Sequence, residues 1–519
     1  MQLGGLQNNM NKLSLDFSGG MNSHTTPLLL KDNESELILN YNLDKVGALT
    51  RRNGYSLFST INLFYFSGLI GVMNPNTRTG LLYTTTNDAI EADATVRKTY
   101  YKGEADAGWV VTDDITAKPF QPVTGAANEI YPTRFVLFLN YVFRLTGGDA
   151  PLSFLISTPQ TKTTTNLTDT ETSAALAIIP SLGAVFQDRV YFNRAADGFR
   201  SRLYYSTLGV SGGTITWNTN TSTGQWFDVN PDDGDFITAL ENNGNHLLIF
   251  KNYAMYRWIF GQVEADRIIG VGTASQESVK TNFELSITFF ANPKGIYAYD
   301  GNRPKLISGK IQEYVDAITN FNWRFCAGHV DKDHYYLSVG DITVNSRTIS
   351  NAWFVYNILL DAWTIHSLAM HANVFADVGD TVIYPNKRIV FNADLASFGF
   401  TYNLSTVTYD LSSTTTQKTI DAEVLTKEHL LVFPEKTKLE NIDVIAIQGG
   451  DTKVSYQIDR NLTGKEGDFI SCKERLNERV NTLRVGKKMH TVRLRLADNS
   501  QRSSIIEGYN LEHTPQNDR

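Results

Sequence analysis

The sequence predicts an all-β protein: a β-propeller of about six to eight blades, with an extended N-terminal arm before it and a C-terminal β-sandwich after it. Aromatic residues make up 11% of the 519 residues, and flat rings are common on the pleated faces of sheets. Short apolar runs separated by Gly, Asn and Pro turns recur along the chain, whereas helical periodicity is scarce. The predicted parts are the arm at 1–54, the propeller at 55–410 and the sandwich at 411–519.

Composition and charge exclude several classes of protein. Hydrophobic residues at 42% and charged residues at 19% are typical of a folded globular chain. The net charge of -7 argues against sequence-independent binding of nucleic acid, which needs a basic surface. The two cysteines, Cys326 and Cys472, predict no disulfide framework and fit assembly in a reducing cytoplasm. We expect neither a secretory signal nor a membrane span, because no suitable apolar run is present.

The N-terminal arm differs from the rest of the chain. Short runs within Leu28–Glu34, Leu37–Asn42 and Gly47–Tyr55 are joined by Gly and Asn turns, and they predict an extended segment that lies along something else. The alternative is a first β-hairpin that caps the propeller.

The pattern of strands and turns is clearest between Phe236 and Ser308. Two consecutive modules there each consist of apolar, aromatic-rich runs of a few residues joined by Asn- and Gly-containing turns, which is typical of antiparallel hairpins. Similar clusters recur at a spacing of roughly 35 to 50 residues, as in known propeller families. The clusters are Leu69–Thr85, Tyr131–Leu155, Gly183–Leu208, Phe236–Phe260, Leu285–Ser308, Phe325–His366 and Asn373–Leu404.

Three segments depart from the blade pattern. Lys310–Ile318 has helical periodicity with Ser308 as its N-cap, which predicts a short connecting helix. Asp169–Ile179 is a second candidate helix. Thr158–Thr172 is rich in threonine and predicts a surface loop.

After the linker 412–416 the pattern restarts with six runs of alternating polar and apolar residues, which predict a β-sandwich. Alternation within Val492–Leu496 places Arg493 and Arg495 together on one face, predicted to be exposed. The six runs are 419–424, 439–447, 453–458, 482–486, 490–496 and 504–511.

No stretch supplies a convincing catalytic or metal motif. Gly209–Gly213 matches G-x-S-x-G but lies in a Gly/Thr loop between strands, so a turn is favoured. Asp228–Asp235 resembles the start of a calcium loop, yet its glycine is one place late and Ala239 stands where a bidentate Glu belongs. His329–His334 contains two histidines and two aspartates, which fit a solvated turn better than a metal site. We therefore assign no catalytic, cofactor-binding or metal-binding residue and predict a protein that is not an enzyme; whether a cation binds near Asp228–Asp235 stays open.

Aromatic runs offer a second kind of candidate site. They could stack on bases or sugars, but packing within and between blades is the ordinary explanation and is favoured. The runs are Phe64–Phe66, Tyr100–Tyr101, Tyr204–Tyr205 and Tyr335–Tyr336.

Three regions, in order, resemble one family: the tail nozzle proteins of short-tailed bacteriophages, also called tail tubular protein B. The arm is similar to the family opening F-x-G-G-[LM]-N, D-x-E, N-x-[NS] and G-A-L-x-[RK]-R-x-G-Y. The matching segments of the arm are Phe17–Asn22, Asp32–Glu34, Asn40–Asn42 and Gly47–Tyr55. Those of the middle are Asp233–Leu240, His246–Lys251, Gly270–Ser278 and Gly295–Gly301, and those of the C-terminal part are Leu483–Lys488 and 491–496.

The resemblance implies a structural protein of the virion tail, assembled in the host bacterial cytoplasm. It implies a homohexameric ring that retains the genome and then releases it, with a tail adaptor or tube protein above it and tail fibres or spikes as neighbours. Double-stranded DNA would pass through the lumen without sequence-specific contact, and a net-acidic subunit suits such a conduit. Arg493, Arg495 and Lys487–Lys488 are then expected to face acidic protein neighbours, and the loop 158–172 is a candidate gate or fibre seat.

Two alternatives remain. One is a receptor-binding or glycan-cleaving propeller, although no Asp-box of the form S-x-D-x-G-x-x-W is present. The other is a kelch-like adaptor, because Trp353–Tyr356 and Asp361–Thr364 resemble a kelch strand pair without the diglycine upstream. The adaptor predicts a monomer that is not associated with virions.

Overall fold

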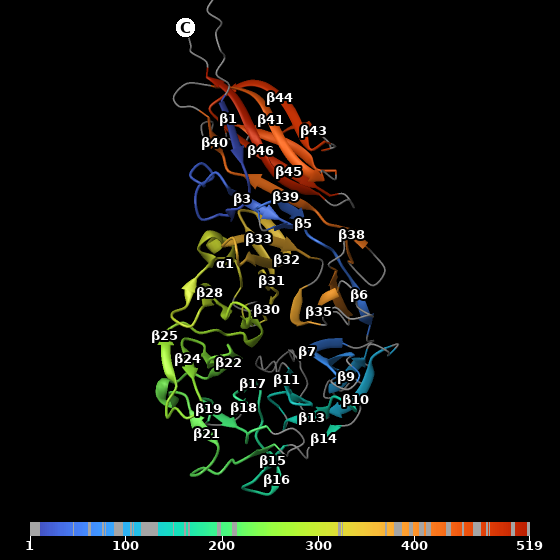
Figure 1. Ribbon diagram of the computed structural model, residues 1–519, viewed down its shortest axis with the longest axis vertical. Coiled ribbons are helices and arrows are strands. Elements are labelled where there is room, and N and C mark those ends of the chain that lie inside the picture. The colour runs from blue at the N-terminus through green and yellow to red at the C-terminus, as the bar shows by residue number, and fades with distance from the viewer. Residues whose placement is uncertain are drawn as a thin grey trace, which may run out of the picture.

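The computed structural model is an all-β protein with a propeller-like arrangement of small sheets, as the sequence predicts (Figure 1). It describes residues 11–44, 46–60, 64–74, 77, 79–87, 97–103, 106, 108–115, 133–148, 150–159, 162–163, 167–194, 199–209, 215–319, 323, 325–368, 371–377, 387–393, 398–403, 409–411, 417–431, 437–448, 451–459, 469–473, 476, 478–499 and 504–515. Within these residues, no helix is both long and apolar enough to cross a membrane.

Six separate four-stranded sheets form most of the lower part of Figure 1. In each of them neighbouring strands are antiparallel, as in a series of hairpins. The first three sheets are β7 (Phe64–Met73), β8 (Gly80–Asn87), β9 (Arg97–Gly103) and β10 (Val110–Ile115); β11 (Arg134–Phe138), β12 (Tyr141–Leu145), β13 (Leu152–Leu155) and β14 (Lys162–Thr163); and β17 (Gly183–Phe186), β18 (Arg189–Asn193), β19 (Arg202–Tyr205) and β21 (Trp226–Asp228).

The remaining three sheets repeat the arrangement, except that one takes its fourth strand from the other end of the chain. They are β22 (Ile237–Asn242), β23 (Leu247–Lys251), β24 (Met255–Trp258) and β25 (Asp266–Ile269); β26 (Lys280–Asn282), β27 (Ile287–Asn292), β28 (Gly295–Tyr299) and β29 (Lys305–Leu306); and β34 (Ala372–Asp377), β35 (Lys387–Ala393), β36 (Phe398–Asn403) and β6 (Tyr55–Thr60).

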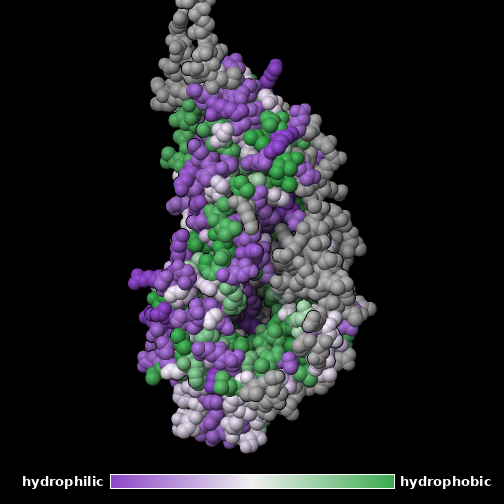
Figure 2. Space-filling model, viewed as in Figure 1, coloured by the Kyte–Doolittle hydropathy of each residue, from purple (hydrophilic) through white to green (hydrophobic). Residues whose placement is uncertain are grey.

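A seventh four-stranded meander belongs to a larger sheet. It consists of β30 (Ala327–Val330), β31 (His334–Val344), β32 (Arg347–Asn357) and β33 (Ala362–Ser367). The first strand of every meander contacts the first strand of the next along the chain, and β34 contacts β7. Figure 2 shows this face of the molecule hollowed near the middle of these sheets.

Of the two predicted helices, one is confirmed and one is wrong. The 3-10 turn Ser308–Ile311 leads into α1 (Gln312–Asp316) within the predicted segment. Ser308 is not its N-cap, because the Ser308 hydroxyl instead accepts the backbone N–H of Ile296. The segment Asp169–Ile179 is not helical, since the carboxylate of Asp169 accepts the backbone N–H groups of Glu171 and Thr219 and so stabilises a turn. The strands formed there are β15 (Thr168–Asp169), β16 (Ala174–Ala175) and β20 (Thr216–Trp217), and 3-10 turns occur at Pro231–Asp233 and Gln276–Ser278.

The upper part of Figure 1 consists of two sheets built from both ends of the chain. One sheet has the order β4-β5-β46-β41-β44, with β1 also paired to β46. The other continues the seventh meander outward as β33-β3-β39-β45-β42-β43, with β2 on β3 and β40 on β45. Their bounds are β1 (Asn11–Leu15), β2 (Gly20–Met21), β3 (Glu34–Leu39), β4 (Tyr41–Leu43), β5 (Leu49–Arg51), β39 (Ala422–Thr426), β40 (His429–Leu430), β41 (Thr437–Gln448), β42 (Lys453–Ile458), β43 (Ile470–Lys473), β44 (Val480–Met489), β45 (Thr491–Asp498) and β46 (Ile505–Pro515), and the small pair β37 (Tyr409–Leu411) and β38 (Gln417–Thr419) precedes them.

All six predicted C-terminal strands are present, and the arm lies along other parts of the chain, as predicted, rather than forming a hairpin that caps the propeller-like part. Its strands pair with β33, β39 and β46, so the two sheets could not be completed by the C-terminal residues alone. One hydrophobic cluster accordingly runs through the arm, the seventh meander and both C-terminal sheets. Representative members from these parts are Leu37, Phe354, Val444 and Leu496.

The two C-terminal sheets are linked by a buried polar contact that makes their stability pH-dependent. His429 of β40 lies 2.7 Å from the hydroxyl of Tyr509 of β46, and burial lowers the pKa of His429 to about 3. The unfolded chain therefore binds a proton at His429 that the folded chain does not bind between pH values of about 6.5 and 3.

We expect stability to fall as the pH falls through that window, by roughly 2 to 3 kcal/mol at pH 4.5 from this histidine. His429→Gln should remove this contribution, as measured by urea unfolding at a series of pH values. His24→Gln at an exposed position is the control. An unchanged pH dependence in His429→Gln would contradict the assignment.

Candidate functional site

The arm residues that carry the family resemblance converge where the seventh meander meets the C-terminal sheets. Asn40 stands at the centre of this junction, in the left-handed region with a φ of 59°, which Asn tolerates. Its side-chain oxygen accepts Nε of Arg52 at 2.7 Å and the backbone N–H of Ser367 at 2.8 Å, and its amide donates to the carbonyl of Asp421. One buried side chain thereby joins β33 to the start of β39.

Arg51 and Arg52 lie on either side of the junction and both are fully buried. Arg52 donates to the carbonyl of Ser367 on the meander side, at 2.8 Å. Arg51 pairs with Asp498 of β45 at 3.1 Å, and neither side chain of that pair is exposed. Burial lowers the pKa of Arg51, and the carboxylate of Asp498 opposes that shift. The twin arginines thus hold the two parts of the chain against the arm.

A second polar cluster fixes the beginning of the arm. The carboxylate of Glu34 accepts the side-chain amide of Asn22 at 2.9 Å and lies 3.3 Å from the ammonium of Lys310. Burial acts to raise the pKa of Glu34, but these partners and the backbone N–H of Lys31 hold it below its usual value. Gly20 has a φ of 67°, and an added Cβ would lie 2.7 Å from Cβ of Ala362. The glycine is required because the arm backbone approaches β33 closely.

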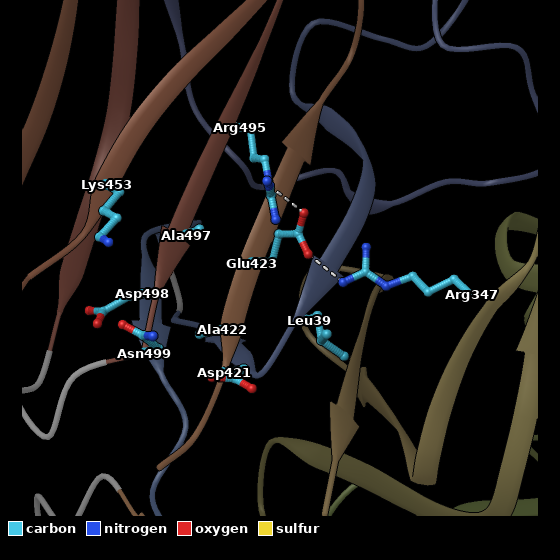
Figure 3. Close-up of a pocket in the computed structure, with 10 residues that line it drawn as sticks. All are labelled: Leu39, Arg347, Asp421, Ala422, Glu423, Lys453, Arg495, Ala497, Asp498 and Asn499. Atoms are coloured by element: carbon cyan, nitrogen blue, oxygen red, sulfur yellow. Dashed lines mark hydrogen bonds and ion pairs between the residues drawn. The ribbon is translucent and has the colours of Figure 1, made fainter. Parts of the chain in front are cut away.

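The junction also contains a pocket of about 340 Å³ (Figure 3). Its floor is the outer face of the sheet formed by β3, β39, β45 and β42, and Arg347 reaches it from the start of β32. Glu423 accepts Nε of Arg495 at 2.7 Å and also pairs with Arg347. The lining residues are Leu39, Arg347, Asp421, Ala422, Glu423, Lys453, Arg495, Ala497, Asp498 and Asn499.

The acidic loop Asp228–Asp235 binds the side-chain ammonium of Lys251. The ammonium of Lys251 is fully buried and lies 2.8 Å from both carboxylate oxygens of Asp233, 2.9 Å from the carbonyl of Asn230 and 3.0 Å from the hydroxyl of Ser201. Arg202 takes both oxygens of Asp228. Two of the four aspartates in this loop, Asp228 and Asp233, are therefore already paired with basic side chains.

Replacing Lys251 by methionine should destabilise the protein by about 2 kcal/mol, because the carboxylate of Asp233 would lose its buried partner while keeping some contact with water. Burial acts to raise the pKa of Asp233, whereas the hydrogen bond and the charge of Lys251 hold this pKa below its usual value. In Lys251→Met the ionised carboxylate should lose that stabilisation. Thermal unfolding measures the change. Lys305→Met, at an exposed position, should cost less than about 0.5 kcal/mol; an equal cost for both would contradict the role given to Lys251.

The other sequence candidates are a G-x-S-x-G match and the turn at His329–His334. Residues 210–213 of the match at Gly209–Gly213 lie outside the described residues. In the turn after β30, the carboxylate of Asp331 accepts the backbone N–H groups of Asp333 and His334, while His329 packs against Tyr336 and Phe375. Across the described part of the chain, no three His, Cys, Asp or Glu side chains gather as a metal site.

The aromatic pairs that the structure describes serve packing, as favoured from the sequence. Tyr100, Tyr101, Tyr204, Tyr335 and Tyr336 are all buried. Tyr205 is half-buried and meets the edge of the Phe260 ring. The side chains of Phe64–Phe66 lie outside the described ones.

The predicted exposure is wrong for Arg493, whereas the side chain of Arg495 is partly exposed. The two side chains share a face of β45, as the alternation requires, but Arg493 is only 3% exposed and pairs with Glu36 of the arm. Arg495 is half-buried and pairs with Glu423. Both arginines therefore pair with acidic residues of the same chain. The alternation within one strand could not predict the burial of Arg493, because the residue that pairs with it, Glu36, lies hundreds of positions away in the sequence. Lys487 and Lys488 are exposed on β44.

Comparisons with known proteins identify no family for this chain. No protein-family model and no curated protein matches the chain. Among solved structures, the chain is similar to Sqt1 of Saccharomyces cerevisiae, with 9% identity, a TM-score of 0.37, and 68% of this chain and 99% of Sqt1 covered. It is also similar to PorZ, a surface component of the type-IX secretion system of Porphyromonas gingivalis, with 12% identity, a TM-score of 0.35, and 70% and 39% covered.

Proposed function

We propose that the chain is a non-enzymatic structural subunit of the distal tail nozzle of a short-tailed bacteriophage. In this proposal it forms a ring, a homohexamer, that retains the packaged genome and opens for ejection. A tail adaptor or tube protein lies above the ring, tail fibres or spikes lie beside it, and DNA passes through the lumen without sequence-specific contact. The subunit is assembled in the cytoplasm of the host bacterium and ends in the virion tail.

The observation that carries the proposal is the position of the arm residues that resemble the nozzle family. Glu34, Asn40, Arg51 and Arg52 are buried and hydrogen-bonded between the seventh meander and the C-terminal sheets. A loose arm would leave such groups in water, and burying them without partners would cost several kcal/mol. The arm residues of the resemblance therefore connect two parts of the chain, which suits the wall of a conduit.

We further propose that the propeller-like part is a closed ring of seven blades. The contacts of successive first strands, including that of β34 with β7, support a ring. The pairing of β6 with β36 supports closure, because a strand from before the first blade completes the last one. Closure of this kind removes the free edges that an open row of sheets would expose. One of the two C-terminal sheets then extends the seventh meander outward, through β33 and β3.

The net charge of -7 supports a conduit in which duplex DNA moves freely, because a strongly basic wall would bind the phosphates along its length. The three-stranded sheet β16-β15-β20 lies at the end of the molecule farthest from the C-terminal sheets (Figure 1). We propose this end, which includes residues of the predicted loop 158–172, as the gate or the fibre seat.

The test is gold labelling of a C-terminally tagged copy in purified phage particles, viewed by negative-stain electron microscopy. Gold at the distal tip of a short tail is the expected result. Gold on peripheral fibres would replace the nozzle by a receptor-binding or glycan-cleaving tail protein. Absence from intact particles would overturn both and favour the kelch-like adaptor.

A further inference from the structure

Three neighbouring meanders present several of their turns at one end. They are the sheets β22–β25 and β26–β29 and the seventh meander, and in an antiparallel meander the first and third turns lie at the same end. Nη1 of Arg257 lies 3.4 Å from the carbonyl oxygen of Gly301, and the side-chain amide of Asn282 lies 3.2 Å from that of Asp331, so the turns of adjacent meanders meet. Together the turns form what we call the turn surface: 243–246, 259–265, 283–286, 300–304, 331–333 and 358–361.

The turn surface is apolar and acidic. Val263 is 90% exposed and Phe283 is 63% exposed, and contiguous exposed apolar side chains are typical of interaction sites. The other large exposed apolar residues of these turns are Phe260, Leu285 and Leu359. Four exposed carboxylates outnumber two exposed cations; they are Glu264, Glu284, Asp300 and Asp361, against Arg303 and Lys332. The surface therefore suits a partner with apolar and basic residues.

A surface of the opposite charge lies on β44, the last strand of its sheet. Among the described residues, no strand pairs with the outer edge of β44. Arg484 and Lys488 are exposed, and within the described part of the chain neither pairs with a carboxylate. Lys487 is exposed as well, with its ammonium 5.8 Å from the ring centroid of Tyr456. We call the following residues the edge surface, which includes two exposed apolar side chains: Ile447, Val480, Arg484, Lys487 and Lys488.

The two surfaces match each other but cannot meet within one chain. Figure 1 shows β44 among the C-terminal sheets, well away from β24, β25 and β28. Two turn surfaces would oppose acidic residues to acidic ones, and two edge surfaces would oppose basic residues to basic ones, so both symmetric contacts are unfavourable. The edge surface of one copy against the turn surface of another pairs opposite charges and covers apolar side chains on both sides.

We propose that the turn surface of one copy of this chain binds the edge surface of a second copy. The contact uses two different patches, so each copy keeps one patch free for a further copy, and the series closes into a ring where the rotation fits. The inference deepens the proposed nozzle and rests on it for the closed ring, whereas the contact itself needs only these two surfaces.

The experiment is sedimentation velocity of the full chain over a range of protein concentrations and sodium chloride concentrations. We expect association that increases with protein concentration and weakens with salt, because exposed charges are screened. The turn variant, Phe283→Ser with Leu359→Ser, and the edge variant, Arg484→Glu with Lys488→Glu, should each raise the dissociation constant at least about ten-fold. All four positions are exposed, so both variants should fold, as circular dichroism can check.

An equimolar mixture of the two variants tests the head-to-tail arrangement. The turn variant keeps an intact edge surface and the edge variant keeps an intact turn surface. The mixture should therefore form dimers about as readily as the unmodified chain associates, and no larger species. Matched controls lie at the opposite end of the same meanders: Tyr253→Ser, at a position 75% exposed, and Lys294→Glu should associate like the unmodified chain.

Three outcomes would overturn the contact: a chain that is monomeric at every concentration, association that neither variant weakens, or variants that do not dimerise when mixed. These outcomes are separate from the test of the nozzle. A monomeric chain that is nevertheless labelled at the tail tip would overturn the contact alone. Dimers in the mixture without label on virions would support the contact and overturn the nozzle.

Discussion

Replacing Arg51 by methionine should destabilise the protein by about 3 to 5 kcal/mol, the cost of leaving a buried charge without its partner. Neither Arg51 nor Asp498 exposes any of its side chain, so water cannot solvate the carboxylate that remains. Methionine keeps much of the volume of the arginine stem, and the loss therefore measures charge and hydrogen bonding more than packing. Equilibrium unfolding in urea, followed by tryptophan fluorescence, gives the free energy.

Two further variants interpret that measurement. Arg257→Met breaks an exposed pair with Asp266 and should cost less than about 1 kcal/mol. Combining Arg51→Met with Asp498→Asn should recover part of the lost stability, because the asparagine side chain is neutral and no unpaired charge remains buried. Similar costs for Arg51→Met and Arg257→Met would show that the buried pair does not hold the junction.

Replacing Trp363 by alanine should cost about 3 to 5 kcal/mol, as large core truncations do. Trp363 is fully buried on β33, its ring centroid lies 4.8 Å from that of Tyr356, and its Nε1 donates to the carbonyl of Ile307 at 2.9 Å. Because β33 stands between β32 and β3, the cavity would open where the seventh meander joins the arm. Thermal unfolding of the full chain measures the effect.

Trp363→Phe separates the ring from its hydrogen bond. Phenylalanine keeps most of the apolar contact and should lose about 1 to 2 kcal/mol, because the carbonyl of Ile307 loses a donor. Phe283→Ala, at a position 63% exposed, should change stability by less than about 0.5 kcal/mol. A small effect of Trp363→Ala would mean that β33 is not the packed link described above.

Local pattern was sufficient to predict the strands but not their partners. The alternation in 453–458 predicts β42 with the same bounds, because a period of two is a property of the strand alone. The pairing of β1 with β46 joins residues nearly 500 positions apart, and no local pattern encodes such a register. The segment after Asp169 shows the converse failure, since its composition permits a helix while the side chain of Asp169 stabilises a turn with Thr219, fifty residues later.

The candidate sites were predictable only where the residues are close in sequence. The sequence indicated that Asp228–Asp235 is rich in oxygen ligands, but the ammonium that neutralises it comes from Lys251 on β23. The pocket combines Leu39, Arg347 and residues beyond 420, so no motif of fixed spacing describes it. Arg51 and Arg52 belong to a segment that resembles the tail nozzle family, but their burial at the junction depends on the fold and is not encoded in the local sequence.

The pairing of β1 with β46 sets an order for biogenesis. During translation at roughly 5 to 20 residues per second, the first strand waits for about half a minute or more before its partner leaves the ribosome. A prematurely terminated chain lacks β46 and therefore leaves β1, β5 and β41 with unsatisfied edges. An incomplete chain therefore exposes strand edges that the complete chain covers, and such edges are templates for pairing with other chains.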